Sequence, residues 1–303
     1  MFKKISIIGL GLIGSSLARI TMNKQLAETL VAVDINPKVC DKVRELGIAH
    51  EATTSLSEGV KNSDLVILCV PVGAMGLIGE AIAPFLKDKA IVTDVGSVKQ
   101  AVIDALKPHL PQTVELVPGH PIAGTEHSGP ESGFPELFEG RWTILTPLHN
   151  TSVEAIDKVS AFWQECGAKI EIMEAAHHDL ILGITSHLPH LIAYTIVGTA
   201  DNLEDDIKSE VIKYSASGFR GFTRIAASDP TMWRDVFLNN KRAVLEILQR
   251  FSEDLSTMQK AIRQGDGDAL FEAFSRSRQI RKQIMEMGPE GYPSPERVKT
   301  GRD

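Results

Sequence analysis

Cysteine is scarce in this chain of 303 residues. The three cysteines, Cys40, Cys69 and Cys166, form no C-x-x-C pair, and their number is odd. This usage indicates neither a disulfide framework nor a cysteine-based zinc site, and it is typical of proteins in a reducing compartment. We therefore expect a cytoplasmic protein.

A cluster of positive charge is also lacking. The chain has 32 lysine and arginine residues against 39 aspartate and glutamate residues, and its formal net charge is -7. Proteins that bind nucleic acid usually present a basic face, so we expect no nucleic-acid partner. Any anionic ligand must be held by local cationic groups and by backbone N–H donors.

The sequence gives little support for a membrane-spanning segment or a secretory signal. Residues 65–79 are apolar but too short to span a bilayer, and Pro71, Gly73 and Gly76 interrupt them. The basic start and the apolar residues 5–18 resemble a secretory signal, yet the same residues satisfy a stricter pattern that is described below. We expect no membrane partner.

The first half of the chain alternates short apolar runs with helical patterns. Near-continuous apolar runs are typical of strands buried on both faces of a parallel sheet, and the alternation predicts a doubly wound α/β domain of the Rossmann type. The expected strands are residues 4–8, 30–34, 65–70, 90–94, 114–117, 142–146 and 169–172, and the expected helices are residues 12–23, 37–46, 75–86, 98–106 and 153–165.

After about Glu174 the alternation stops and the remaining patterns are helical. The expected helices are residues 175–200, 205–214, 231–237, 241–264 and 268–285. We therefore predict an α/β domain over residues 1–174, an all-helical domain over residues 175–287 and a mobile tail over residues 288–303.

Residues 241–264 carry a regular apolar stripe. Its members are Val244, Leu248, Phe251, Leu255, Met258 and Ile262, which alternate spacings of four and three over nearly three heptads. Packing inside the helical domain and a dimer interface both fit such a stripe. We favour a mixture of the two, because a helical domain of this size needs buried partners on several faces.

A glycine-rich motif follows the first expected strand. Gly9, Gly11 and Gly14 form the pattern G-x-G-x-x-G, and Leu12 and Ile13 complete it at the start of an expected helix. In this context the glycines permit a tight turn, close approach of a pyrophosphate and close helix–strand packing, with the phosphates on the helix N-terminus. The pattern predicts a dinucleotide-binding site.

Asp34 lies twenty residues beyond Gly14, at the end of the second expected strand. There its carboxylate can accept hydrogen bonds from the ribose hydroxyls and repel a 2′-phosphate, which predicts NAD rather than NADP. The alternative is an N-cap or turn residue before Pro37. Val70 and Pro71 end a later strand at the same sheet edge, so we expect them near the nicotinamide half of the cofactor.

A glycine- and proline-rich segment, residues 119–129, follows another expected strand and is expected to have irregular backbone. Its His120 is the candidate general base, because removing a proton from an alcohol during hydride transfer needs a group that titrates near neutrality. A loop histidine bonded to a carbonyl fits equally well. Thr125 and Glu126 lie in the same segment.

Ser97 begins the pattern Ser97-Val98-Lys99-Gln100, which predicts a capping box with the serine at the N-cap. Because helix caps at the carboxyl ends of parallel strands face the ligand crevice, its hydroxyl can also contact the cofactor or His120. Both interpretations stay open.

The helical half supplies further polar groups. His187 and His190 are three residues apart and share a helix face, and Pro189 is expected to kink the helix and to free a carbonyl near Thr185. No carboxylate at ligand spacing completes a metal site with the two histidines, so we expect no metal.

Residues 217–234 contain three more candidates, Gly218, Arg224 and Trp233. Arginine suits planar, bidentate recognition of a carboxylate, which makes Arg224 a candidate substrate anchor. A weak surface salt bridge with Asp229 or Asp235 is the alternative.

Together these motifs resemble the prephenate/arogenate dehydrogenase family of tyrosine biosynthesis. The resemblance lies in residues 9–14, 94–99, 119–129, 186–190 and 221–235, with the sequences GLGLIG, DVGSVK, GHPIAGTEHSG, SHLPH and GFTRIAASDPTMWRD. It implies a Rossmann domain followed by a helical dimerisation domain. It also implies NAD-dependent oxidative decarboxylation of prephenate or L-arogenate to 4-hydroxyphenylpyruvate or L-tyrosine, driven by aromatisation of the ring.

The resemblance further implies roles for single residues. His120 is similar to the family's catalytic histidine, and Ser97 to the serine that orients it. Arg224 resembles the arginine that binds a substrate carboxylate. The other substrate-binding candidates are Thr125, Glu126, His187, His190, Trp233 and Gly218, with Trp233 placed to reach across a homodimer.

Two other functions stay open. A β-hydroxyacid dehydrogenase of the 6-phosphogluconate dehydrogenase type shares the two-domain plan, but that group uses a helix lysine and residues 175–200 contain none. A non-catalytic NAD-binding sensor would keep the glycine motif and would have no need of His120, Ser97 and Arg224 together.

Overall fold

The computed structural model describes residues 2–125, 127, 129–203, 207, 210 and 213–286. By their internal contacts the residues form two compact units, Met1–Val244 and Leu245–Asp303. The predicted tail at residues 288–303 and the candidate Glu126 lie outside the described residues, as does most of the expected helix at residues 205–214.

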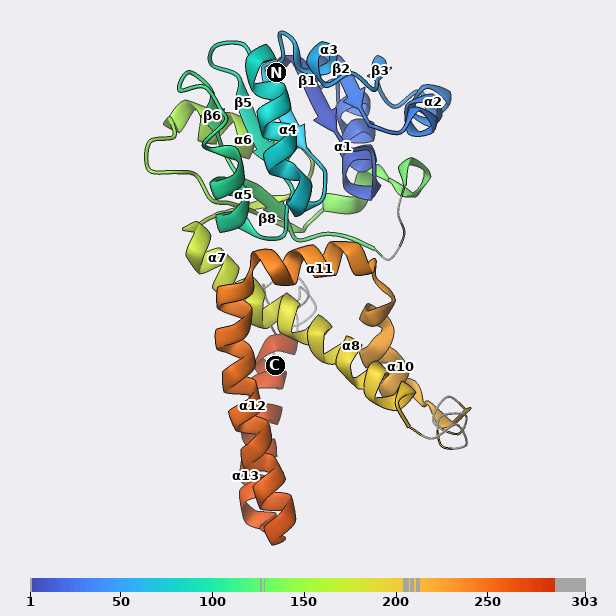
Figure 1. Ribbon diagram of the computed structural model, residues 1–303, viewed down its shortest axis with the longest axis vertical. Coiled ribbons are helices and arrows are strands. Elements are labelled where there is room, and N and C mark those ends of the chain that lie inside the picture. Colours follow the sequence, from blue (N-terminus) through green and yellow to red (C-terminus); the bar gives the residue numbers. More distant parts are fainter. Residues whose placement is uncertain are drawn as a thin grey trace, which may run out of the picture. The chain divides into compact units, whose positions relative to one another are not determined.

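The first unit is built on a parallel six-stranded sheet of the Rossmann type, with the strand order β3-β2-β1-β4-β5-β6 (Figure 1). The strands are β1 (Phe2–Ile8), β2 (Ala27–Val33), β3 (Glu51–Thr53), β4 (Leu65–Leu68), β5 (Ile91–Asp94) and β6 (Glu115–Leu116). The helices between them are α1 (Leu12–Asn23), α2 (Pro37–Leu46), α3 (Leu56–Val60), α4 (Met75–Ile82) and α5 (Lys99–Leu106). The predicted doubly wound α/β domain is therefore confirmed. Of the strands of this sheet and the helices between them, sequence patterns missed β3 and α3, because both are short.

The central strands are buried on both faces. In β4, Leu65 and Ile67 pack in one hydrophobic cluster and Val66 and Leu68 in another, and all four are fully buried. A strand covered on both faces needs apolar residues at every position, which explains the continuous apolar run in the sequence. The rigid sheet thereby fixes the carboxyl ends of its parallel strands at one edge, where ligands bind in such folds.

A second sheet, with the order β7-β8-β9, carries part of the candidate site. β8 (Trp142–Leu145) pairs antiparallel with β7 (Gly119–Pro121) and parallel with β9 (Lys169–Ile172), and α6 (Val153–Glu165) connects the last two. The expectation of irregular backbone at residue 120 is wrong, because His120 lies in β7 and pairs with Ile144. A glycine and a proline flank His120, and they hid so short a strand from sequence patterns.

Helices make up most of the described residues after Glu174. These are α7 (Ala175–Leu182), α8 (Leu188–Asp201), α10 (Ser217–Thr223), α11 (Pro230–Asn239), α12 (Lys241–Gln264) and α13 (Gly267–Glu286). Short 3-10 turns occur at Val72–Ala74, Ala83–Phe85, Pro130–Ser132, Pro135–Phe138 and Arg224–Ala227. A π-helical turn, Gly183–His187, interrupts the helix expected over residues 175–200. It ends two residues before Pro189, whose missing N–H breaks the α-helical ladder.

Two helical stretches leave apolar surface uncovered in the single chain. In the stripe of α12, Leu255 is 58% and Ile262 is 67% exposed, whereas Val244 is buried.

The stretch Ala175–Asp201 has a mean hydropathy of 1.5 in an 18-residue window, so by length and composition alone it could cross a bilayer. Core helices of soluble proteins pass the same test, and this stretch holds the fully buried polar residue His178.

Candidate active site

The turn between β1 and α1 depends on glycine. Gly9 has a φ of 92°, and a Cβ there would lie 2.4 Å from the Cys69 carbonyl oxygen. A Cβ at Gly14 would lie 1.9 Å from the Gly9 carbonyl oxygen. Gly11 is the N-cap of α1, and among the described residues no side chain caps this helix or lies within 4 Å of a Cβ built at Gly11. The N–H groups of the first helical turn therefore face open space that can take a pyrophosphate.

The other predicted cofactor residues lie around this turn. The Asp34 carboxylate accepts hydrogen bonds from the backbone N–H of Leu10 at 2.9 Å and of Asn36 at 3.0 Å. The N-cap of α2 is Asn36, so the N-cap interpretation of Asp34 is wrong, although its turn contact exists. Through the hydrogen bond from Leu10, the Asp34 carboxylate links the end of β2 to the glycine turn. Leu12 and Ile13 open α1, and Val70 and Pro71 follow β4.

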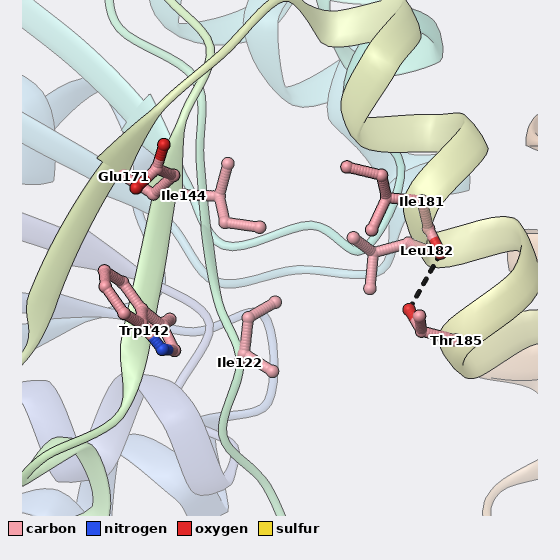
Figure 2. Close-up of a pocket in the computed structure, with 7 residues that line it drawn as sticks. All are labelled: Ile122, Trp142, Ile144, Glu171, Ile181, Leu182 and Thr185. Atoms are coloured by element: carbon pink, nitrogen blue, oxygen red, sulfur yellow. Dashed lines mark hydrogen bonds between the residues drawn. The ribbon is translucent and has the colours of Figure 1, made fainter. Parts of the chain in front are cut away.

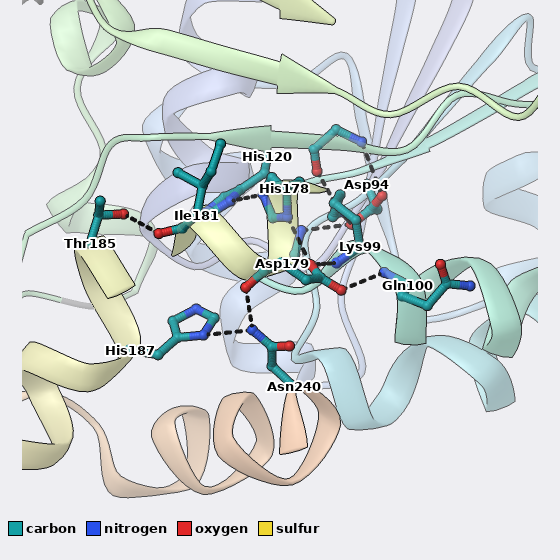
Figure 3. Close-up of polar contacts among 12 residues, drawn as sticks. Asp94, Lys99, Gln100, His120, His178, Asp179, Ile181, Thr185, His187 and Asn240 are labelled. Carbon is teal, nitrogen blue, oxygen red and sulfur yellow. Dashed lines mark hydrogen bonds and ion pairs between the residues drawn. The ribbon is translucent and has the colours of Figure 1, made fainter. Parts of the chain in front are cut away.

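A buried chain of side chains holds His120 (Figure 3). Its Nδ1 lies 2.8 Å from Nε2 of His178, and Nδ1 of His178 lies 2.8 Å from Oδ1 of Asp179. His120 is 8% exposed and His178 is fully buried. His120 comes from β7 and the other two residues come from α7, so the fold brings together groups that lie 58 positions apart.

Asp179 also caps α5 from another part of the chain. Its carboxylate accepts hydrogen bonds from the backbone N–H of Lys99 at 2.7 Å and of Gln100 at 3.0 Å. The N-cap residue of α5 is Val98, and it makes no side-chain cap, so the predicted capping box at Ser97 is wrong. The tertiary contact supplies the acceptor that the capping box would have supplied.

A buried ion pair joins β5 to the strand of His120. Lys99 and Asp94 are fully buried and in direct contact. The Lys99 ammonium also donates to the Gly119 carbonyl oxygen at 2.6 Å, and Asp94 accepts from the Gly119 N–H at 3.2 Å. Removing either charge would leave the other uncompensated in the interior. The pair therefore fixes the backbone from which His120 projects.

Burial keeps His120 neutral. It lowers the pKa of His120 well below its usual value, and the neighbouring charges of His178, Lys99 and His187 act in the same direction. Near pH 7 the ring therefore has a lone pair that can accept a proton. Burial also lowers the pKa of His178, but the hydrogen bond to Asp179 opposes that shift. A positive charge is therefore more favourable on His178, which lies beside the Asp179 carboxylate, than on His120.

Around His190, two buried N–H donors find no protein partner among the described residues. The Asn240 amide nitrogen donates to the carbonyl oxygen of Asp179 at 2.8 Å, which identifies it as the nitrogen, and it lies 3.0 Å from Nδ1 of His187. Nδ1 of His187 therefore accepts, and this neutral ring carries its proton on Nε2. Nε2 of His187 and Nε1 of Trp233 are the two donors. They point to a ligand that supplies acceptors.

The two histidines predicted on one helix face both contact Trp233. His190 stacks on the indole with 3.6 Å between ring centroids, and His187 meets the same ring edge-on at 6.0 Å. His190 donates from Nδ1 to the Ser186 carbonyl oxygen at 2.8 Å. Trp233 is 6% exposed, so residues of its own chain already cover it. This burial favours a place in the pocket of its own subunit.

Arg224 lies in the 3-10 turn that follows α10 and is exposed. Its charge adds to the effect of burial in lowering the pKa of His190, so the two side chains lie near each other. Of the two carboxylates considered as salt-bridge partners, Asp229 caps α11 and Asp235 pairs with Arg234. The position beside His190 agrees with a role as substrate anchor.

Three predicted residues stand apart from these contacts. Ser97 is half-buried just before α5, and its hydroxyl makes no hydrogen bond to the residues that the structure describes, so it is not joined to His120. Thr125 is exposed, and its hydroxyl accepts from the His127 N–H at 3.2 Å. Gly218 lies exposed in the first turn of α10 with open space around it.

An apolar hollow of about 240 Å³ lies on the sheet face that carries His120 (Figure 2). Ile144, the cross-strand partner of His120, is one of its walls. The remaining walls are Ile122, Trp142, Glu171, Ile181, Leu182 and Thr185. None of the predicted substrate-binding residues that the structure describes lines it, so those residues do not converge on this hollow.

Acidification is expected to destabilise the fold through His187. Burial lowers its pKa from 6.5 to about 4. The unfolded chain takes up a proton here as the pH falls through 6.5, whereas the folded chain resists until about 4, so stability is lost across that window. The loss is at most about 3 kcal/mol. Thermal unfolding of the wild type and of His187→Gln over this window measures it, and equal pH slopes would contradict the assignment.

Sequence reasoning missed five residues of the polar network, namely Asp94, Lys99, His178, Asp179 and Asn240. A signal was present for two of them, since an adjacent histidine and aspartate open an expected helix. The interpretation of that helix from sequence considers only His187 and His190. Asp94 and Lys99 lie in residues 94–99, a segment that carries the family resemblance, but the sequence assigned a role there only to Ser97. Asn240 has no local feature that marks it.

Two family descriptions match the chain. The nucleotide-binding domain of prephenate dehydrogenase matches residues 17–172. The dimerization domain of prephenate dehydrogenase matches residues 174–276. Together they span both halves of the molecule.

Curated relatives and solved structures agree with these matches. Cyclohexadienyl dehydrogenase of Zymomonas mobilis is 44% identical over 281 residues, covering 93% of this chain and 96% of the relative. Prephenate dehydrogenase of Bacillus subtilis is 31% identical, covering 91% and 75%. The crystal structure of prephenate dehydrogenase from A. aeolicus in complex with hydroxyphenyl propionate and NAD+ is 34% identical, covers 94% of this chain and 99% of that chain, and has a TM-score of 0.87. The chain belongs to the prephenate dehydrogenase family.

Proposed function

We propose that this protein catalyses the NAD-dependent oxidative decarboxylation of prephenate, L-arogenate or both, giving 4-hydroxyphenylpyruvate or L-tyrosine. The observation that carries the proposal is the buried, neutral His120, which is held against the carboxyl end of β5 at the cofactor edge of the Rossmann sheet. The relatives support the substrate class, since they include prephenate and cyclohexadienyl dehydrogenases.

The glycine turn fits a dinucleotide. A Cβ at Gly11 would fill the open space over the N-terminus of α1, and Asp34 lies beside that turn. Gly9, Gly14, Leu12 and Ile13 would hold the pyrophosphate, and Val70 and Pro71 would lie beside the nicotinamide half. When bound, NAD supplies the hydride acceptor.

His120 is the proposed general base. As hydride leaves the ring carbon that bears the hydroxyl, His120 accepts the hydroxyl proton. The electrons of the bond to the departing carbon dioxide then aromatise the ring, and His120 returns the proton to the ring oxygen. Ser97, whose hydroxyl is not engaged by the described residues, is proposed to orient the substrate hydroxyl.

The substrate side chain is proposed to lie against Trp233 and the two histidines beside it. Arg224 binds a carboxylate, and the buried donors of His187 and Trp233 suit a keto or carboxylate oxygen. Nδ1 of His190 donates to a backbone carbonyl, so Nε2 of the neutral ring can accept from the ammonium group of L-arogenate. These side chains therefore offer partners to both substrates. Thr125, Glu126 and Gly218 stay proposed as substrate contacts.

Initial rates of NADH or NADPH formation with prephenate and with L-arogenate test the proposal. We expect turnover with NAD and at least one of the two substrates. Turnover with both would make the protein a cyclohexadienyl dehydrogenase. Absence of turnover with every pairing, in protein that binds NAD, would contradict the proposed function.

Replacing Asp34 by serine is expected to weaken the preference for NAD over NADP. The carboxylate repels a 2′-phosphate, and its loss should change the ratio of kcat/KM values about tenfold, or about 1.4 kcal/mol. Steady-state kinetics with both cofactors measure the ratio. Asp41→Ser, at an exposed position of α2, is the matched control and should leave the ratio unchanged. An unchanged ratio in Asp34→Ser would show that this carboxylate does not select the cofactor.

The assembly is proposed to be a homodimer. The dimerization-domain match and the exposed apolar residues of α12 support an interface formed by the helical domain. The proposed domains are an NAD-binding domain over residues 1–174, this helical domain over residues 175–287 and a tail over residues 288–303. The three free cysteines support a cytoplasmic location. Sedimentation equilibrium measures the mass in solution, and a monomer would contradict the dimer.

A further inference from the structure

The directions of the hydrogen bonds between Asp179 and His120 can be assigned. Asp179 lies at the N-terminus of α5, where two backbone N–H groups and the helix dipole favour its negative charge. An ionised carboxylate only accepts, so Nδ1 of His178 donates to it. The neutral His178 ring then has its lone pair on Nε2 and accepts from Nδ1–H of His120. His120 is left with its own lone pair on Nε2.

The opposite arrangement is unfavourable in this interior. A proton on Nε2 of His120 would set the Nδ1 lone pair against the lone pair of His178 at 2.8 Å, at a place almost closed to water. Reversing the His178 tautomer would instead set a lone pair against the Asp179 carboxylate.

The other charged or titratable groups that act on the two rings are engaged elsewhere. The ammonium of Lys99 binds Asp94 and the carbonyl oxygen of Gly119. Nδ1 of His187 accepts from Asn240. The chain from Asp179 through His178 therefore decides which nitrogen of His120 carries the lone pair.

We propose that His178, held by Asp179, is a positioning residue that keeps the reactive lone pair of His120 on Nε2 and shares the positive charge that His120 gains during the reaction. The role during turnover rests on the proposed function. The tautomer follows from the hydrogen bonds and does not depend on the reaction.

The chain stabilises the protonated state of His120. When Nε2 accepts the hydroxyl proton of the substrate, the ring becomes an imidazolium and its Nδ1–H bond to His178 becomes charge-assisted. His178 donates in turn to Asp179, so the new charge is spread toward a carboxylate. Return of the proton to the ring oxygen restores neutral His120 with the same tautomer, and no proton is lost or gained overall.

Substitution of His178 separates this role from a structural one. His178→Phe removes the acceptor and keeps a ring, and we expect kcat to fall about 100-fold or more while the Michaelis constants change less than about threefold. The side-chain oxygen of His178→Gln can accept from Nδ1–H, so this variant should recover at least about tenfold of the loss. His177→Phe, at the exposed neighbouring position, is the control and should keep the wild-type kcat.

Long-range proton–nitrogen NMR of wild-type protein with labelled histidine reads the tautomer directly, and His120→Asn assigns its signals. We expect a protonated Nδ1 and an unprotonated Nε2. The opposite tautomer, a wild-type kcat in His178→Phe, or a loss that His178→Gln does not recover would overturn the proposal. If His178→Phe fails to fold, the kcat of His178→Gln and the tautomer of His120 measured by NMR decide whether the proposal holds. If the wild type turns over neither substrate, the proposed function fails and the NMR result still tests the tautomer.

Discussion

Replacing His120 by asparagine is expected to lower kcat by about 10²- to 10⁴-fold, because asparagine cannot accept the hydroxyl proton. Burial lowers the pKa of His120 and so keeps the ring unprotonated near neutral pH, which is the state that a general base requires. Asparagine is smaller than histidine and polar, so it should be tolerated in β7. Steady-state kinetics with prephenate and L-arogenate measure the loss, and binding of NAD should stay within about threefold of wild type.

The control for this change is His127→Asn, which alters an exposed histidine of the same segment. It should leave kcat unchanged. A His120→Asn enzyme with wild-type kcat would remove His120 from the chemistry. If His120→Asn lost NAD binding and activity to the same extent, His120 would instead have a structural role in the cofactor site.

Replacing Arg224 by alanine is expected to raise the Michaelis constant for the substrate about 30-fold and to leave that for NAD nearly unchanged. Loss of a charge-assisted contact with a carboxylate costs about 2 kcal/mol, which corresponds to that factor. The side chain lies near His190, beside the buried donors of His187 and Trp233, and far in sequence from the glycine turn. Initial rates with each reactant varied in turn measure both constants.

A matched change elsewhere tests whether lost charge alone explains such a result. Arg250→Ala removes an exposed arginine of α12 that pairs with Glu246, and both constants should stay at wild-type values. Equal increases in the two constants for Arg224→Ala would argue against carboxylate binding. A lower kcat with unchanged constants would place Arg224 at the reacting ring instead.

The α/β half of the fold could be predicted because its signals are local. Residues 12–23, 37–46 and 153–165 are helices with the predicted bounds, and their ends coincide with features such as the Asn36 and Ser152 caps. The buried strands appear as continuous apolar runs. β7 escaped because a strand of three residues with a glycine and a proline has no periodicity to detect.

The sequence could predict the candidate site only where the role of a residue depends on its neighbours in the chain. The glycine turn is of this kind, because backbone conformation and close packing dictate each glycine. The surroundings of His120 are not, since His178 lies 58 positions later in the chain. The cap of α5 comes from Asp179, 80 positions beyond Lys99, so a local capping box looked sufficient although the fold uses a distant acceptor. Contacts across such separations leave no regular pattern in one sequence.

The product balance of the complete reaction tests the central claim most directly. Purified protein is incubated with NAD and whichever of prephenate or L-arogenate it turns over, and NADH, carbon dioxide and the aromatic product are measured in the same sample. We expect the three products in equal amounts, with 4-hydroxyphenylpyruvate from prephenate or L-tyrosine from L-arogenate. Formation of NADH without carbon dioxide and without an aromatic product would contradict oxidative decarboxylation and the role assigned to His120.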